Sequence, residues 1–230
     1  MRSAKCADGG KRSRHGKPSA FSGTTMRNPG TRRMILCVDM DGVLAVWNRW
    51  AGVKEYTDPA YFLALPPICE GVDSVRLLAD AGLDVRIEST VGGERACEIA
   101  AAKLEWLRRA GLGDIQAIFP PCGTDKYLAA EAAFHPSGAD MVLLDDYTKN
   151  LVSWSGHGGK AVKFLHGDNG FGGKWQGARV RASEGAHAIA RAVLTAAGSG
   201  SAMPVAAEKR LSRQAAPGTL LTYDRPGMAC

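Results

Sequence analysis

Between residues 34 and 197, short apolar runs alternate with amphipathic stretches, and this alternation leaves the chain few possible folds. Runs of mostly apolar residues predict five strands, at 34–38, 83–87, 115–119, 141–144 and 161–165. The stretches between and after them predict helices at 71–81, 93–110, 126–133 and 183–197. Strands separated by helices favour an α/β fold, a mostly parallel sheet covered on both faces. In such a sheet the ligand crevice lies outside the carboxyl ends of the strands.

Apolar residues at helical spacing predict which face of each helix packs on the sheet. In the helix at 71–81 the inward residues are expected to be Val72, Val75, Leu78 and Ala79. In the helix at 93–110 they are expected to be Ala96, Ile99, Ala100, Leu104 and Leu107.

Basic charge is concentrated outside this patterned region. Residues 1–33 carry a balance of +8, residues 34–195 carry −4, and the remaining residues carry +2, which gives the net charge of +6. The patterned region is therefore mildly acidic, and we expect no groove for nucleic acid on it. Residues 1–31 and 198–230 have little large apolar surface to bury, so we expect disordered tails there, flanking a domain at 32–197.

The six cysteines have no C-x-x-C pair and no zinc-like spacing, which favours reduced, structural thiols in a reducing compartment such as the cytoplasm. No apolar run approaches about 20 residues, the length of a membrane-spanning helix, so no contact with a membrane is expected.

Acidic residues follow two of the predicted strands in pairs. Asp39 and Asp41 follow the first strand, with Gly42 next to them, and Asp145 and Asp146 follow the strand at 141–144. A single acid in such a place is often a helix cap or a turn residue. Four acids at two strand ends repel one another unless a cation lies among them. A hard ion such as Mg²⁺, with a phosphate group as a further ligand, explains them most simply.

The segments DMDGVLA and LLDD resemble the first and fourth motifs of the haloacid dehalogenase-like (HAD) phosphohydrolase superfamily. RIEST, with Ser89, and PCGTDK, with Lys126, occupy the places of the second and third motifs. The stretch from DDYTKNLVSW to KFLHGDNGFGGKW is similar to the 5′(3′)-deoxyribonucleotidases. The resemblance covers about residues 34–180 and implies a Rossmann-like, three-layer HAD fold.

This resemblance implies a Mg²⁺-dependent phosphomonoesterase that works through an aspartyl-phosphate. Asp39 would be the nucleophile and Asp41 the acid and base. Ser89 and Lys126 would bind the phosphate; whether Ser89 or Thr90 faces it stays open, because the strand before them carries Arg86 and Glu88.

The implied metal site consists of the Asp39 carboxylate, the Asp41 backbone carbonyl and the Asp145 carboxylate, with Asp146 bound directly or through water. Asn150 would brace the loop after Asp146 or cap a helix. His157 and His166 have no partner at metal-binding spacing and are not expected to be ligands.

The segment between the first strand and the helix at 71–81 leaves only about residues 46–70 for a cap over the site. Trp47 and Trp50 in this segment could stack on a nucleobase or form the core of the cap. The most plausible substrate is a small phosphorylated molecule, a (deoxy)nucleoside monophosphate. Alternatives are a sugar phosphate, a polynucleotide end or a phosphoprotein, or a binding protein without activity, because a fold does not determine its substrate.

Overall fold

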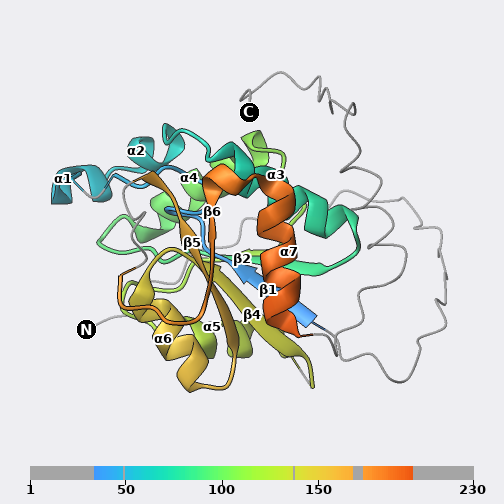
Figure 1. Cartoon of the computed structure of the whole chain (residues 1–230). Coiled ribbons are helices and arrows are strands. Elements are labelled where there is room, and N and C mark those ends of the chain that lie inside the picture. The colour runs from blue at the N-terminus through green and yellow to red at the C-terminus, as the bar shows by residue number, and fades with distance from the viewer. Residues whose placement is uncertain (1–33, 49, 137, 168–172, 199–230) are drawn as a thin grey trace, which may run out of the picture. The chain divides into compact units, whose positions relative to one another are not determined.

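Within the described part of the chain, six parallel strands form one sheet in the order β3-β2-β1-β4-β5-β6 (Figure 1). The strands are β1 (Met34–Val38), β2 (Asp84–Glu88), β3 (Ala117–Ile118), β4 (Asp140–Asp145), β5 (Lys160–Leu165) and β6 (Ala178–Arg181). This computed structural model describes residues 34–48, 50–136, 138–167 and 173–198, which belong to one compact unit. The expected tails lie outside the described residues, except for Gly198.

Helices connect the strands and cover both faces of the sheet. They are α1 (Val53–Tyr56), α2 (Pro59–Leu63), α3 (Cys69–Asp80), α4 (Ala96–Arg109), α5 (Lys126–Phe134), α6 (Thr148–Gly156) and α7 (Ala186–Ala197), with a 3₁₀ turn at Ala182–Glu184. The expected Rossmann-like α/β fold is confirmed. None of the described helices is long and apolar enough to cross a membrane.

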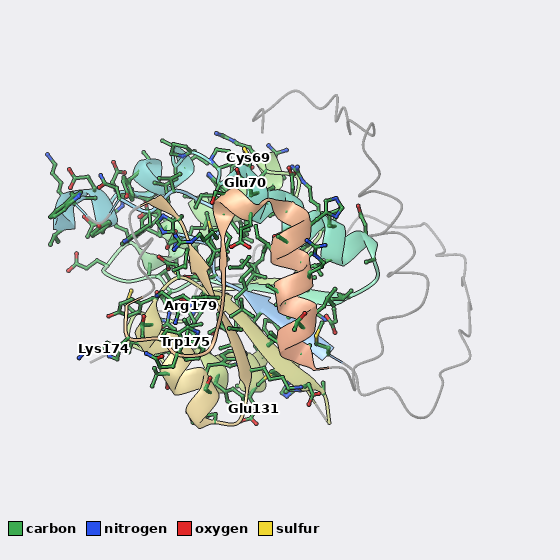
Figure 2. All side chains as sticks on the ribbon, viewed as in Figure 1. Cys69, Glu70, Glu131, Lys174, Trp175 and Arg179 are labelled. Atoms are coloured by element: carbon green, nitrogen blue, oxygen red, sulfur yellow. The ribbon has the colours of Figure 1, made fainter. Side chains whose placement is uncertain are left out.

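The period of two along the central strands separates two cores, because successive side chains point to opposite faces. Leu36 and Val38 of β1 face the larger core, which includes apolar residues of α3, α4 and α7. Ile35 and Cys37 face the smaller core with α5 and α6. Trp175, labelled in Figure 2, packs against this second core and donates from Nε1 to the Ala178 carbonyl, 2.8 Å away. Burial on both faces explains why the central strands are continuous apolar runs.

The sequence prediction was wrong where an element lacks an apolar pattern. It missed β6, in which Val180 alone is buried, and α6, whose buried residues are only Leu151 and Trp154. It also extended the third strand too far, because only Ala117 and Ile118 pair with β2. The last predicted helix begins at Ala186, after the 3₁₀ turn.

Helix α4 also differs from the prediction in the face that it buries. Leu104 is 50% exposed, whereas Lys103 and Trp106 are completely buried. The buried face therefore includes a charged residue, and its contacts are described below.

Segment 46–68, between β1 and α3, contains α1 and α2 and is attached to the sheet domain by buried contacts. Trp106 of α4 donates from Nε1 to the Leu65 carbonyl, 2.7 Å away. The Ile68 amide donates to the Leu44 carbonyl outside the segment, and the Val46 amide donates to the Pro66 carbonyl, which joins the two ends of the segment to each other. We call this segment the cap.

Helix α3 passes very close to the turn that follows β1. An ideal Cβ built on Gly71 would lie 2.0 Å from the Val43 carbonyl oxygen, which belongs to the backbone and cannot swing away. Gly71 therefore allows the close approach that fixes α3 against the turn carrying Asp39 and Asp41.

We expect Gly71→Ala to lower the free energy of unfolding by at least ~2 kcal/mol, because the added methyl forces the helix and the turn apart. Urea denaturation measures this difference. Gly156→Ala is the matched control, since Gly156 is also helical and its Cβ would meet nothing within 4 Å. The free energy of unfolding of Gly156→Ala should equal or exceed that of the wild type, because alanine has a higher helix propensity than glycine. An equal fall in the free energy of unfolding in both variants would contradict a role for Gly71 in the close approach of α3.

Candidate active site

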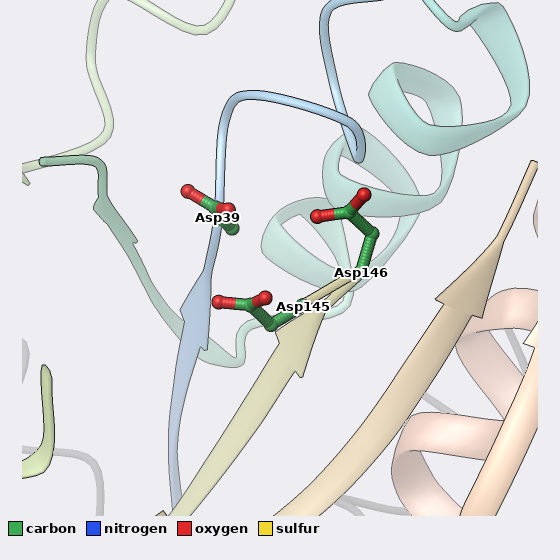
Figure 3. A group of neighbouring side chains, drawn as sticks. All are labelled: Asp39, Asp145 and Asp146. Carbon is green, nitrogen blue, oxygen red and sulfur yellow. The ribbon is translucent and has the colours of Figure 1, made fainter. Parts of the chain in front are cut away.

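Three carboxylates converge at the carboxyl ends of the two central strands. Asp39 follows β1, Asp145 is the last residue of β4, and Asp146 follows it (Figure 3). One oxygen from each carboxylate lies within 4.8 Å of the others. Because β1 and β4 pair in parallel, with Val38 opposite Leu144, the two strands end side by side and bring the acids together. The predicted grouping of these three acids is thus present in the structure.

Lys126, at the start of α5, places its ammonium group between two of these carboxylates. Its Nζ lies 2.9 Å from Asp39 Oδ1 and 2.8 Å from Asp145 Oδ2, and the side chain is 3% exposed. Burial alone would lower the pKa of Lys126, but Asp145 and Asp39 outweigh it and raise that pKa. Lys126 is therefore a fixed positive charge at the site.

Further hydrogen bonds orient Asp145 and Asp146. Asp145 accepts from the Tyr147 amide at 2.6 Å and from the Asn150 side-chain amide at 2.9 Å. Asn150 thus positions Asp145 from the first turn of α6, which is closer to the bracing role than to the capping role. His166 Nε2 lies 3.2 Å from Asp146 Oδ2, a contact that the sequence gave no reason to expect.

Gly42 allows Asp146 to approach the turn after β1. Its φ is +82°, which side-chain-bearing residues rarely adopt, and an ideal Cβ would lie 2.5 Å from Asp146 Oδ2. Two separate constraints, backbone conformation and space, therefore require glycine here.

Asp41 faces a different set of partners from Asp39. Its Oδ2 lies 2.5 Å from Lys103 Nζ and accepts a hydrogen bond from the Ser89 hydroxyl at 3.3 Å. Lys103 Nζ also donates to Ser89 Oγ at 2.8 Å and to the Thr90 carbonyl at 3.1 Å. The side chain of Ser89 thus faces the site, whereas Thr90 offers a backbone carbonyl to Lys103.

The sequence analysis did not identify Lys103 as a functional residue. The ammonium is completely buried, lies 4.7 Å from the ring centroid of Phe62 in the cap, and so joins the cap to Asp41. Its spacing held a usable signal, because position 103 lies four residues after Ile99 and four before Leu107, on the apolar face of α4. A lysine inside such a face needs a buried charged partner.

Glu88, the last residue of β2, is also completely buried beside the site. Neither carboxylate oxygen has a hydrogen-bond partner among the described residues. Burial raises the pKa of Glu88 to about 8, although Lys126 acts in the opposite direction. Glu88 is therefore a carboxyl that this environment keeps largely protonated near neutral pH.

The charges at the site suit a divalent cation. Burial raises the pKa of Asp39. The nearby carboxylates of Asp145 and Asp41 raise it further, and Lys126 offsets part of this rise. Burial also raises the pKa of Asp146, while the hydrogen bond to His166 lowers it. Lys126 contacts the carboxylates of Asp39 and Asp145, and Lys163 contacts Asp146 through its backbone carbonyl. Two lysines do not neutralise the whole cluster, and a cation among the oxygens of the three carboxylates would stabilise their ionised forms. Carboxylate oxygens are the ligands that Mg²⁺ prefers, so this donor set fits that ion.

The two tryptophans of the cap lie in different environments. Trp47 stacks on Tyr56, with ring centroids 4.6 Å apart, and packs against the larger core. Trp50 is 78% exposed. One face of Trp47 is therefore already used within the cap, as the core interpretation predicts.

Solved structures resemble this arrangement of strands and helices, and two of them illustrate the resemblance. A protein described as a HAD-like phosphatase from Mesorhizobium loti has a TM-score of 0.50 and 15% identity, and the match covers 72% of this chain and 88% of that one. The chain has a HAD-like fold. The D,D-heptose 1,7-bisphosphate phosphatase from Burkholderia thailandensis has a TM-score of 0.48 and 16% identity, covering 71% and 99%. No protein-family model and no curated protein matches the sequence. The finer resemblance to deoxyribonucleotidases stays a prediction.

The buried carboxyl of Glu88 should make the stability of this HAD-like domain depend on pH. A raised pKa in the folded state gives stability that is complete below about pH 4.5 and is lost as pH rises through about 8. The free energy of unfolding of the wild type, relative to Glu88→Gln, should therefore fall across this window by on the order of 3 kcal/mol.

Urea titrations from pH 5 to 9 in EDTA measure this difference. Glu131→Gln is the control, because Glu131 is an exposed carboxylate on α5 (Figure 2). Its difference from the wild type should stay flat with pH. Parallel curves for the wild type and Glu88→Gln would show that Glu88 titrates normally.

Gly42→Ala should weaken cation binding, because the new methyl displaces Asp146. We expect Mg²⁺ to raise the melting temperature of the wild type, as any ligand that binds only the folded state does. This rise should be lost in Gly42→Ala. Gly82→Ala is the matched control, since Gly82 has a φ of +86° and open space around its Cβ. The free energy of unfolding of Gly82→Ala should fall by about 1–2 kcal/mol because of backbone strain, but Mg²⁺ should raise its melting temperature as much as that of the wild type. If Mg²⁺ fails to raise the melting temperature of either variant, backbone strain alone explains the loss.

Proposed function

We propose that this protein is a phosphohydrolase that removes the phosphate group from phosphomonoesters through an aspartyl-phosphate. The supporting observation is that two carboxylates two residues apart, Asp39 and Asp41, have separate partners. Asp39 lies with Asp145, Asp146 and Lys126, whereas Asp41 lies with Ser89 and Lys103. Two acids in separate environments can perform two different tasks in one reaction.

Asp39 is the proposed nucleophile. Its carboxylate is held by Lys126 and by a 2.8 Å hydrogen bond from the Met40 amide, so its orientation is fixed before the substrate arrives. An Asp39 oxygen attacks phosphorus, and the bond from phosphorus to the ester oxygen breaks. This covalent step divides one difficult displacement into two easier ones.

Asp41 is the proposed acid and base. It gives a proton to the departing ester oxygen, and in the second step it takes one from the water that attacks the aspartyl-phosphate. Lys103 holds the carboxylate on the side of Ser89 and so fixes the direction from which the proton is delivered.

Ser89 and Lys126 are the proposed phosphate-binding residues. The Ser89 oxygen already accepts from Lys103, which leaves its hydrogen free to turn from Asp41 to a phosphoryl oxygen. Lys126 offsets the negative charge that the dianion brings to Asp39.

The metal in this proposal is Mg²⁺, held by Asp39, Asp145, Asp146 and the Asp41 backbone carbonyl. When bound, it supplies positive charge to the phosphoryl oxygens and lets Asp39 stay ionised beside its acidic neighbours. The binding residues for this charge are rigid, since Asn150, Tyr147 and Lys126 orient Asp145.

The substrate proposed is a small phosphorylated molecule, and a nucleoside monophosphate is its most specific form. The resemblance of the segment that begins with DDYTKNLVSW to the deoxyribonucleotidases supports the nucleotide. The solved structure from Burkholderia is a heptose bisphosphate phosphatase, so a sugar phosphate is the alternative to test beside it.

Asp39→Asn should keep the shape of the site and abolish the attack on phosphorus. We expect kcat for p-nitrophenyl phosphate to fall at least ~10³-fold, about 4 kcal/mol of transition-state stabilisation. Asp140→Asn is the control, because Asp140 begins the neighbouring strand β4, at the end opposite to Asp145; its kcat should stay within about twofold of the wild type. EDTA should abolish the wild-type activity and Mg²⁺ restore it. More than a tenth of the wild-type kcat in Asp39→Asn would contradict the assignment.

A further inference from the structure

A cavity of about 520 Å³ is lined by residues that the proposed mechanism does not use. Its walls come from the loop at 91–93, from Ala96, Cys97 and Ala100 of α4, and from Phe119, Pro121 and Cys122 after β3. A volume of this size is typical of pockets that hold small organic ligands. All three walls lie beyond the carboxyl ends of β2 and β3, where parallel sheets bind their ligands.

Backbone hydrogen bonds hold two of these walls together. The Val91 amide donates to the Pro120 carbonyl at 3.0 Å, and the Cys122 amide donates to the Val91 carbonyl at 2.8 Å. The loop after β2 and the loop after β3 thus continue side by side beyond their strands. Two of the three walls are therefore fixed to each other by their backbones.

Helix α4 connects the cavity to the reacting groups. Ala96, Ala100 and Lys103 are spaced four and three residues apart, so they lie on one face of the helix. Ala96 and Ala100 line the cavity, and Lys103, one turn further, contacts Asp41. The loop wall begins at Val91, two residues after Ser89. A group that leaves phosphorus and takes a proton from Asp41 would therefore be adjacent to the cavity.

The chemistry of the walls restricts what such a group can be. Among the described residues that line the cavity, no side chain is a carboxylate, an amide, a hydroxyl or a cation; the polar side-chain groups are the thiols of Cys97 and Cys122. A polyhydroxylated sugar bound there would find no side-chain partner for its hydroxyls except the two thiols, so it would gain little from these walls. A flat ring, in contrast, would gain from Phe119 and the apolar wall of α4.

We infer that this cavity binds the organic part of the substrate and selects a planar ring, such as an aryl group or a nucleobase, over a sugar. This inference rests on the proposed phosphohydrolase activity and adds a substrate class to it. It assigns the leaving-group side of the site to α4 and to the loops after β2 and β3.

Substitution of Ala100 by a larger residue tests the inference. Ala100→Leu fills the cavity, whereas Ala101→Leu makes the same change one residue away, at an exposed position that does not line it. We expect Ala100→Leu to lower kcat/KM for 1-naphthyl phosphate at least ~10-fold, which is the discrimination that a few methylene groups provide. Acetyl phosphate, whose leaving group is too small to enter, should change less than twofold. Ala101→Leu should affect neither substrate.

A nucleotide and its fragment distinguish the two kinds of ring. Adenosine 5′-monophosphate and ribose 5-phosphate differ by the base alone. If the ring is a nucleobase, the wild type should prefer the nucleotide at least ~10-fold in kcat/KM, and Ala100→Leu should remove that preference. If 1-naphthyl phosphate alone shows the effect, the ring is an aryl group. A wild type that prefers ribose 5-phosphate to both ring-bearing esters would overturn the inference.

The two thiols provide a readout that needs neither activity nor a variant. 1-Naphthylphosphonate, which cannot be hydrolysed, should slow the alkylation of Cys97 and Cys122 by iodoacetamide at least fivefold, and methylphosphonate should not. Mass spectrometry of the labelled peptides measures both rates. Protection without any Asp39-dependent turnover would support the cavity and reject the proposed function. Unprotected thiols, or equal losses for both substrates in Ala100→Leu, would reject the cavity and leave the phosphohydrolase proposal intact.

Discussion

The Lys126 ammonium between Asp39 and Asp145 is the interaction on which the rest of the site depends. Each carboxylate at the end of a buried strand loses hydration, and each repels its neighbours at this distance. Lys126 reduces both costs, and it can do so because α5 begins at this lysine beyond the end of β3. The same placement leaves the three acids together with too little positive charge, and that shortage makes the cluster suited to a divalent cation.

A second buried lysine gives the site its asymmetry. Asp39 and Asp41 are two acids in one turn, but Lys126 contacts Asp39 and Lys103 contacts Asp41. Lys103 draws the Asp41 carboxylate toward Ser89 and α4, away from the cluster that contains Asp39. The contact of Lys103 with Phe62 extends this arrangement to the cap, so the position of the cap and the position of Asp41 depend on the same ammonium group.

Tight packing of the backbone at two glycines makes this geometry possible. Gly71 lets α3 contact the turn after β1, and Gly42 lets that turn approach Asp146. Both positions place two elements that are distant in sequence within van der Waals distance of each other. Precise placement of charge at the site therefore depends on uncharged residues around it.

The sequence alone determined the strands β1 to β5, the helices α3, α4, α5 and α7, and the main acids of the site. Period-two alternation does not appear in strands buried on both faces, so apolar runs located β1, β4 and β5 correctly. The acids directly after β1 and at the end of β4 could be placed together, because parallel strands end at one edge of a sheet. The edge strand β6 and helix α6 have few buried residues, and local patterns therefore predicted neither.

Only the tertiary structure decided that Lys103, His166 and Glu88 also belong to the site. Lys103 and His166 lie 62 and 20 residues from the carboxylates they contact, and nothing local to them indicates those partners. In the sequence, Glu88 is simply a polar residue in a predicted strand. Only the structure shows that its carboxyl group is buried and has no hydrogen-bond partner among the described residues. The physical reason is that the apolar pattern and the strand ends are encoded by neighbouring residues. Burial, desolvation and ion pairing depend instead on the distances between residues far apart in the chain.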